Sequence, residues 1–245
     1  MTKILITEVK LYLRDWPFAL FTIVLPVGLL VILGVSIPSF TEANPAFGGQ
    51  RFVDTQMPSM MTLLALLTIA CSVLPAVLAT YREQGVLRRM STTPMHPGKM
   101  LTAQLIINVV SGAISTAVLI GTASLVFGSQ APQNWGWFIG VFLLGTAALL
   151  SIGLVIAALA PHGKAASGIG SAVMFPLLFL GGMWVPREIM PDALRTISDY
   201  SLVGPFAQAL KDAWSGQPPQ LSHLMVVTVG LLLFGGLSVR LFRWE

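Results

Sequence analysis

The sequence contains very little charge. Only 10% of its 245 residues are Asp, Glu, Lys or Arg, whereas 55% are hydrophobic, and the mean hydropathy is +0.80. A water-soluble domain of this length needs more polar surface than so few charges can provide. The composition therefore excludes a soluble globular protein and predicts an integral membrane protein.

The sequence also lacks the patterns that most catalytic and metal sites need. Its single cysteine, Cys71, lies inside an apolar segment and predicts neither a disulfide nor a redox compartment. The histidines (His96, His162 and His223) are far apart, and no GxSxG, HExxH, CxxC or GxxxxGK[ST] motif occurs. We therefore expect no catalytic, metal or cofactor site in this chain, and no ATP hydrolysis of its own.

Long stretches without charged residues predict transmembrane helices. A helix needs about 20 apolar residues to cross the hydrocarbon core. Four uncharged stretches can hold one crossing each, and a fifth, residues 100–163, can hold two separated by the polar turn at 129–134. Trp135 and Trp137 after this turn are typical of an interfacial anchor. We predict an all-α protein with six transmembrane helices, at about 17–37, 58–80, 101–127, 135–160, 166–185 and 221–241.

The basic residues predict the orientation of these helices. With six crossings, both termini share one side with the segments 81–99 and 161–165. That side carries ten of the 14 Lys and Arg residues, and the other side carries four. Because basic residues accumulate on the cytoplasmic side, we predict a multi-pass protein of the cell membrane with both termini in the cytoplasm.

The first 15 residues show a helical amphipathic pattern. Lys3, Lys10 and Arg14 fall on one face, and Val9 and Tyr12 fall on the opposite face. This pattern predicts an interfacial helix that lies along the cytoplasmic membrane surface. A frayed basic tail is the alternative.

The segment 186–219 is too charged to cross the membrane, yet it is patterned. Two groups of apolar residues recur at helical spacing, namely Ile189, Met190, Leu194 and Ile197, and then Phe206, Leu210 and Trp214. We predict two short external amphipathic helices that lie on or dip into the outer leaflet. A structured cap without membrane contact is the alternative.

The predicted crossings hold no Asp, Glu, Lys or Arg in their interiors. Transporters driven by ions or protons need such groups at membrane depth, so any uphill transport must draw its energy from elsewhere. Gly136 and Gly140 form a GxxxG pair, and small residues crowd positions 166–172. Both features indicate close helix packing.

The loop 81–99 is unusually basic. If residues 81–91 form a helix, Val86, Leu87 and Met90 make an apolar ridge, and Arg82 and Arg89 share another face. Such a helix is suited to docking in a groove of a partner protein. Alternatively, the arginines only fix the orientation, but that would leave the ridge unexplained.

Two motifs in this layout resemble the type-2 ABC exporter permeases, most of all the bacterial drug and antibiotic exporters. They are REQGVLRR at 82–89, followed by Thr93-Pro94, and GGMWVP at 181–186. The resemblance implies that loop 81–99 couples to a separate ATPase subunit in two copies, which holds ATP and Mg, and that a second permease, identical or homologous, completes the transport path. The ATPase-coupling residues would be Arg82, Glu83, Gly85, Val86, Leu87, Arg88, Arg89, Met90, Thr93 and Pro94.

The same resemblance places an outer gate at the end of the fifth crossing. Its residues would be Gly181, Gly182, Met183, Trp184 and Pro186. The family often ends its external segment with a Pro-Thr/Ser-Tyr type of run, whereas this sequence has YSLVGP at 200–205. The form of the outer gate is therefore left open.

The predicted function is that of a membrane permease of an ATP-driven exporter of a lipophilic or amphipathic substrate, such as a drug, an antibiotic or a lipid-like molecule. The uncharged crossings favour such a substrate, since a strongly anionic polymer would need a basic lining. The alternatives are a polysaccharide or lipid-linked glycan exporter permease, a non-transporting membrane scaffold and, less favoured, an intramembrane enzyme.

Overall fold

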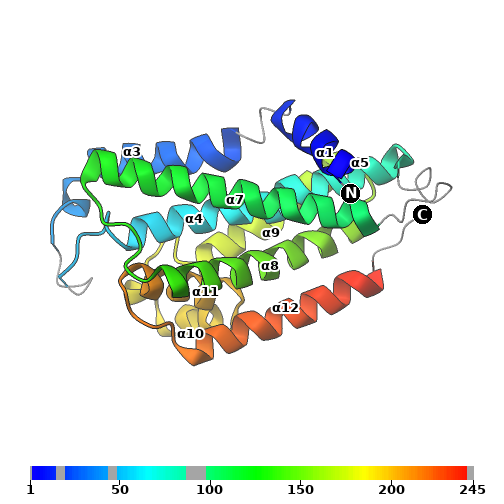
Figure 1. Ribbon diagram of the computed structural model, residues 1–245. Helices are drawn as coiled ribbons and strands as arrows, with labels where there is room; N and C mark the ends of the chain where they lie inside the picture. The colour runs from blue at the N-terminus through cyan, green and yellow to red at the C-terminus, as the bar shows by residue number, and fades with distance from the viewer. Residues whose placement is uncertain (1, 15–19, 44–48, 87–97, 242–245) are drawn as a thin grey trace.

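The computed structural model describes residues 2–14, 20–43, 49–86 and 98–241 (Figure 1). Within these ranges the fold is all-helical, and the only strand-like pairing is an isolated bridge between Ala43 and Arg51. The helices are α1 (Thr2–Arg14), η1 (Leu20–Val24), α3 (Leu25–Ser36), η2 (Pro38–Phe40), α4 (Gln56–Thr68), η4 (Ile69–Val73), α5 (Leu74–Glu83), α7 (Gly98–Phe127), α8 (Trp135–Leu159), α9 (Gly163–Leu180), η5 (Arg187–Ile189), α10 (Asp192–Tyr200), α11 (Val203–Trp214) and α12 (Leu221–Leu241).

The long helices alternate in direction and give the bundle two distinct ends (Figure 1). At one end α5, α8 and α12 finish and α7 and α9 begin. We call it the basic end, because Arg82, Lys99, Lys164 and Arg240 lie there. We call the opposite end, where α10 and α11 pack, the capped end. Both chain termini lie toward the basic end.

In the described part of the chain, five helices are long and apolar enough to cross a membrane: the continuous helix Gln56–Glu83, α7, α8, α9 and α12. The first predicted crossing, 17–37, corresponds to the shorter apolar helix Leu20–Ser36. The all-α membrane fold is thus confirmed, while the count of six crossings stays a prediction. The fifth crossing was predicted to reach residue 185, but α9 ends at Leu180 because the turn at Gly181 and Gly182 stops it.

The continuous helix Gln56–Glu83, formed by α4, η4 and α5, is the centre of the bundle. In its most apolar window, 89% of the residues are buried, against 22% in α9 and 17% in α12. It packs against α3, α7, α8, α9 and α11. We call it the central helix. A helix that is apolar on all sides belongs in the interior of a bundle, while α9 and α12 leave most of their surface to lipid or to another chain.

Two glycines let neighbouring helices touch the backbone of the central helix. At the π-helical turn η4, Gly153 of α8 faces the carbonyl of Ala70, and Gly170 of α9 faces the carbonyl of Cys71. A Cβ at either glycine would overlap the carbonyl oxygen. The close packing predicted for positions 166–172 therefore occurs at Gly170. The predicted Gly136 and Gly140 pair does not pack in this way, because the described residues leave open space around Gly140.

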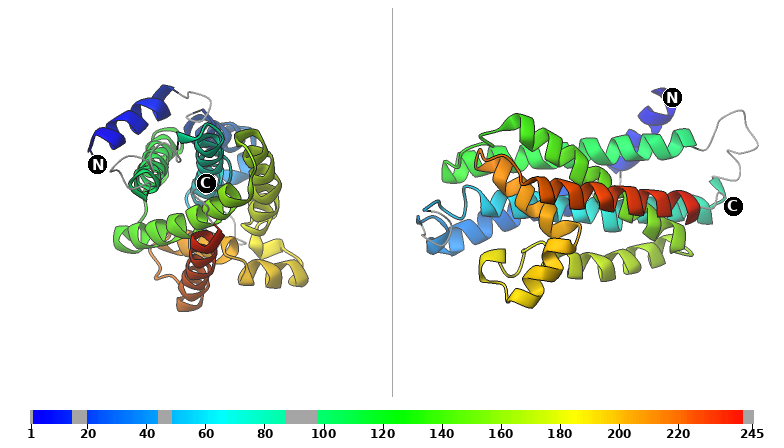
Figure 2. Two further views of the ribbon diagram at one scale, coloured as in Figure 1. Left: turned by 90° about the vertical axis from the view of Figure 1, so that its right-hand side faces the viewer. Right: turned by 90° about the horizontal axis from the view of Figure 1, so that it is seen from below.

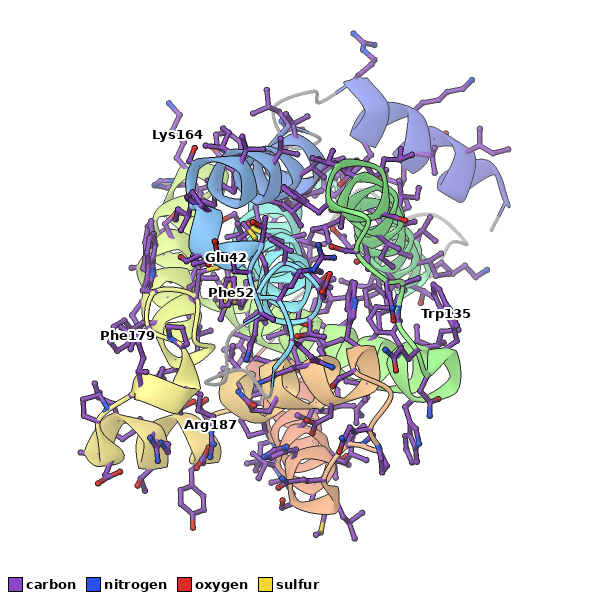
Figure 3. The ribbon with its side chains drawn as sticks, turned by 90° about the vertical axis from the view of Figure 1, so that its left-hand side faces the viewer. Glu42, Phe52, Trp135, Lys164, Phe179 and Arg187 are labelled. Atoms are coloured by element: carbon purple, nitrogen blue, oxygen red, sulfur yellow. The ribbon has the colours of Figure 1, made fainter. Side chains whose placement is uncertain are left out.

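The capped end is closed by the two short helices predicted in the external segment. Figure 3 looks onto this end and shows α11 lying across the bundle, with Arg187 beside α10. Phe206 and Trp214 of α11 are buried, and the Trp214 indole donates to the Gln130 carbonyl at 3.2 Å. Tyr200 of α10, in contrast, is 81% exposed. The apolar side of α11 is thus used inside the bundle, and membrane contact by α10 stays a prediction.

The predicted N-terminal helix is present as α1, on the outside of the bundle next to α7 (Figure 2). Two of its polar side chains face the bundle. Glu8 is only 6% exposed and points inward, and the Tyr12 hydroxyl lies 2.5 Å from Ser111 Oγ of α7. The position of α1 at a membrane interface stays a prediction.

Candidate functional site

The predicted coupling residues fall around the end of α5 at the basic end. Arg82 and Glu83 are the last residues of α5, and Gly85 and Val86 follow it. The remaining predicted coupling residues, Leu87, Arg88, Arg89, Met90, Thr93 and Pro94, lie outside the described residues. Their role stays a prediction.

The sequence interpretation considered one helix over residues 81–91, and the described residues correct it by showing a break after Glu83. α5 ends at Glu83, and Gly85 adopts a φ of 67°, in the left-handed region that favours glycine. The Gly85 N–H donates to the Arg82 carbonyl at 3.0 Å, and Gln84 N–H donates to Thr80 at 2.9 Å. Gly85 therefore terminates the helix, and an apolar ridge cannot run on from α5 through Val86 as a continuous helical face.

The Arg82 side chain binds the end of α8. Its guanidinium donates to the carbonyl of Ala158 at 3.3 Å and to the carbonyl of Ala160. The last carbonyls of a helix lack partners in the helix and carry a partial negative charge. Arg82 satisfies two carbonyls there with a positive group.

The Glu83 side chain binds the start of the next helix. Its Oε2 accepts from the N–H of Gly163, the first residue of α9, at 3.2 Å. His162 caps the same helix, and its Nδ1 accepts from Ala165 N–H at 3.1 Å. A carboxylate is favourable at this position because a helix N-terminus carries a partial positive charge.

Two adjacent residues of opposite charge therefore hold the two sides of one short turn. We call this arrangement the clamp: Arg82 on the end of α8 and Glu83 on the start of α9. Thr80 of α5 packs closely against the same turn, because a Cβ at Gly163 would overlap the Thr80 hydroxyl. The end of α5 is thus hydrogen-bonded to both α8 and α9.

An apolar groove of about 460 Å³ lies along the central helix, and no residue of the clamp lines it. It is formed between η1 and α3 on one side, the central helix at its floor and α9 on the other side. Its most exposed aromatic residues are Phe21, Phe175 and Trp184. No Asp, Glu, Lys or Arg of the described chain lines it.

The polar groups of this groove are four hydroxyls, those of Thr68, Ser72, Ser167 and Ser171. Ser171 Oγ donates to the Ser167 carbonyl at 2.9 Å, and Thr68 Oγ1 donates to the Leu64 carbonyl at 2.8 Å. Hydroxyls bonded to their own helix present little unsatisfied polarity. The groove is therefore suited to an uncharged or weakly polar surface and lacks a counter-charge for an anionic polymer.

The predicted gate residues lie where this groove meets the capped end. Gly181 and Gly182 form the buried turn that ends α9, and Gly182 has a φ of 85°. Met183 and Trp184 then line the groove, and Trp184 is 62% exposed. Pro186 precedes η5. The position is compatible with a gate, but gating itself stays a prediction.

The sequence predicted the location of the clamp but not its contacts. It assigned Arg82 and Glu83 to ATPase coupling, which stays a prediction, and it did not foresee that their side chains bind the turn between α8 and α9. Glu8 was not predicted as a functional residue. The one signal that could have drawn attention to the clamp was an Arg-Glu pair at the end of a crossing on the same side as the short turn at 160–163.

The sequence is similar to known proteins over most of its length. The family described as ABC-2 type transporter has a model that matches residues 2–213. The chain is similar to the "Putative transport permease YvfS" of Bacillus subtilis, at 25% identity over 95% of this chain and 93% of that protein. It is also similar to the "Daunorubicin resistance ABC transporter permease protein DrrB1" of Streptomyces coeruleorubidus, at 26% identity over 89% of this chain and 80% of that protein.

Proposed function

The chain belongs to the ABC-2 type transporter family, and from that premise we propose that it is the permease of an exporter of lipophilic or amphipathic molecules. The observation that carries the substrate class is the groove beside the central helix, which is apolar and uncharged over about 460 Å³. Binding pockets for such molecules are mostly apolar, with few polar groups. The name of the Streptomyces relative supports a drug-like substrate.

The energy for export would come from a separate ATPase that binds ATP and Mg. The predicted crossings are uncharged in their interiors and so offer no charged group to hold a coupling ion. Under this proposal loop 81–99 docks on the ATPase, and the clamp passes its movement to α8 and α9 as rigid bodies. The apolar groove between α3 and α9 is open on one side, where a second permease would close the path.

We expect a large side chain in the groove to block transport. Ser171→Trp would place an indole between α9 and the central helix and fill space that the substrate needs. Daunorubicin efflux from cells that express the permease with its ATPase should fall at least about tenfold. The indole would weaken substrate binding, and a loss of about 1.4 kcal/mol in binding free energy already lowers affinity tenfold. Protein level and recovery with the ATPase should be unchanged.

The matched control is Ser124→Trp on α7. Ser124 is exposed and does not line the groove, so this variant should transport like the wild type. Normal efflux by Ser171→Trp would exclude the groove as the path. Absence of daunorubicin efflux by the wild type, combined with export of a lipid-linked glycan, would favour the glycan exporter instead.

The proposed orientation has six crossings, including Leu20–Ser36, with the basic end in the cytoplasm. It predicts that His162→Cys is labelled by a membrane-impermeant thiol reagent only after the cells are opened, whereas Tyr200→Cys is labelled in intact cells. Both positions are exposed at opposite ends of the bundle. Labelling of both cysteines from the same side would contradict this topology.

A further inference from the structure

A second cavity, of about 290 Å³, lies beneath α1 at the basic end. It is bounded by α1, by the end of the central helix and by the first half of α7. Leu11, Ala76 and Val77 give it an apolar wall. Glu8, Tyr12, Tyr81 and Gln104 give it a polar side. The cavity is thus amphipathic, and it is separate from the groove between α3 and α9.

The carboxylate of Glu8 is the only charged group that lines this cavity in the described chain. Glu8 is 6% exposed, and its Oε2 accepts from the Tyr81 hydroxyl at 2.7 Å and from Gln104 Nε2 at 2.5 Å. Both bonds fall on the same oxygen. Among the described residues, Glu8 takes part in no salt bridge.

A buried carboxylate without a counter-ion is costly. Two neutral donors stabilise it, but they do not balance its charge, and buried charges in proteins are normally paired. The walls of the cavity hold no Lys, Arg or His from the described part of the chain. Tyr12 and Tyr81 also line the cavity, and aromatic rings attract cations through their electron-rich faces. A cation small enough for the cavity would therefore be favoured beside Glu8.

We propose that this cavity binds the ammonium group of a cationic amphiphile. The ammonium lies against Glu8 between the two tyrosines, and the apolar tail follows Leu11 and Val77 toward the outside of the bundle. This site goes beyond the proposed export function, because it needs neither the ATPase nor the groove. The ammonium can come from an amine-bearing lipid or from a non-lipid amphiphile.

Binding to the purified full-length chain in a neutral maltoside detergent tests the proposal. The probe is radiolabelled dodecylamine, and the matched ligand is dodecanol, which has the same chain without the charge. Glu8→Gln keeps an oxygen that accepts from Tyr81 and Gln104, so the fold should persist. We expect saturable dodecylamine binding that weakens at least about tenfold in Glu8→Gln, since hydrogen bonds to charged groups are the stronger class. Dodecanol should bind both proteins equally.

The control variant is Glu42→Gln, the same change at an exposed residue of the capped end, and it should bind dodecylamine like the wild type. Equal affinity of dodecylamine and dodecanol for the wild type would overturn the proposal. So would dodecylamine binding that is unchanged in Glu8→Gln. These measurements involve no transport, so their failure is distinct from a failure of the export function.

A competition experiment identifies the source of the ammonium. Phosphatidylethanolamine and phosphatidylglycerol with identical acyl chains are each added to the dodecylamine complex. Displacement by phosphatidylethanolamine alone assigns the site to a lipid amine, and displacement by neither assigns it to a non-lipid amphiphile. Equal displacement by both lipids would show that the charge is not recognised and would contradict the proposal.

Discussion

Replacing Gly170 with alanine should destabilise the protein strongly, although the change adds only one methyl group. A Cβ at this position overlaps the carbonyl oxygen of Cys71, and the obstacle is backbone, which cannot swing away as a side chain can. α9 must move off the central helix, and we expect a loss of about 3 kcal/mol, the upper part of the usual range for overpacking. The midpoint of thermal unfolding in detergent measures the effect.

Gly168→Ala is the matched control. Gly168 lies on the same helix two residues earlier, and a Cβ there meets nothing within 4 Å. Alanine is favoured over glycine in a helix by up to about 1 kcal/mol, so this variant should be as stable as the wild type or slightly more stable. If both variants unfold at the same temperature, α9 does not approach the π-helical turn as closely as the structure indicates.

Removing the clamp should strongly reduce the proposed export while the permease stays folded. In the double variant Arg82→Ala, Glu83→Ala, the end of α5 no longer holds the turn between α8 and α9. Each lost contact at a helix end is worth only about 0.3–1 kcal/mol in stability, which a folded bundle tolerates. We expect the proposed export, assayed with daunorubicin as a test compound, to fall at least about tenfold, a change equivalent to about 1.4 kcal/mol. ATP turnover by the partner should continue.

Two comparisons separate coupling from a general structural effect. Arg240→Ala removes an exposed arginine from the same end of the bundle and should leave export unchanged. Glu83→Gln keeps an acceptor for the Gly163 N–H and should recover most of the export. Export by the double variant at the wild-type rate would refute the role of the clamp. Parallel loss of export and of thermal stability would reduce it to a structural contact.

The course of the chain was largely predictable because uncharged stretches define membrane helices with little ambiguity. Five of the predicted crossings agree with helices of the structure to within a few residues at most ends. The break between α7 and α8 was also predicted from the polar run at 129–134, where Asn134 caps α8 by accepting from the Trp137 N–H at 3.2 Å. These features depend on local composition and on helix capping.

The contacts between helices were much less predictable. Glu8 is a charged residue in an amphipathic segment, and nothing in its spacing showed that the Tyr81 hydroxyl and the Gln104 amide would bind its buried carboxylate. Gly136 and Gly140 had the expected packing motif, yet the glycines in contact with the central helix are Gly153 and Gly170. The GxxxG spacing identifies small residues that can face another helix. Which helix packs there depends on the arrangement of the whole bundle.

The loop after α5 shows a different limit. The helical spacing of Val86, Leu87 and Met90 suggested a face on the same helix as Arg82, but Gly85, in the left-handed region, ends α5 before Val86. Periodicity counts side chains and does not register where the backbone stops being helical. Gly85 carried that information in the sequence, since glycine is the residue that most often ends a helix in this way.

The burial of Cys71 against α9 has a practical consequence for measuring the transport cycle. Its side chain is 0% exposed, and its carbonyl is covered by Gly170. A thiol enclosed in this way is protected from reagents in water. Labels attached to introduced cysteines should therefore not react with Cys71, and it need not be replaced. Pairs of probes at the two ends of the bundle can therefore report distance changes during ATP turnover without first altering the centre of the protein.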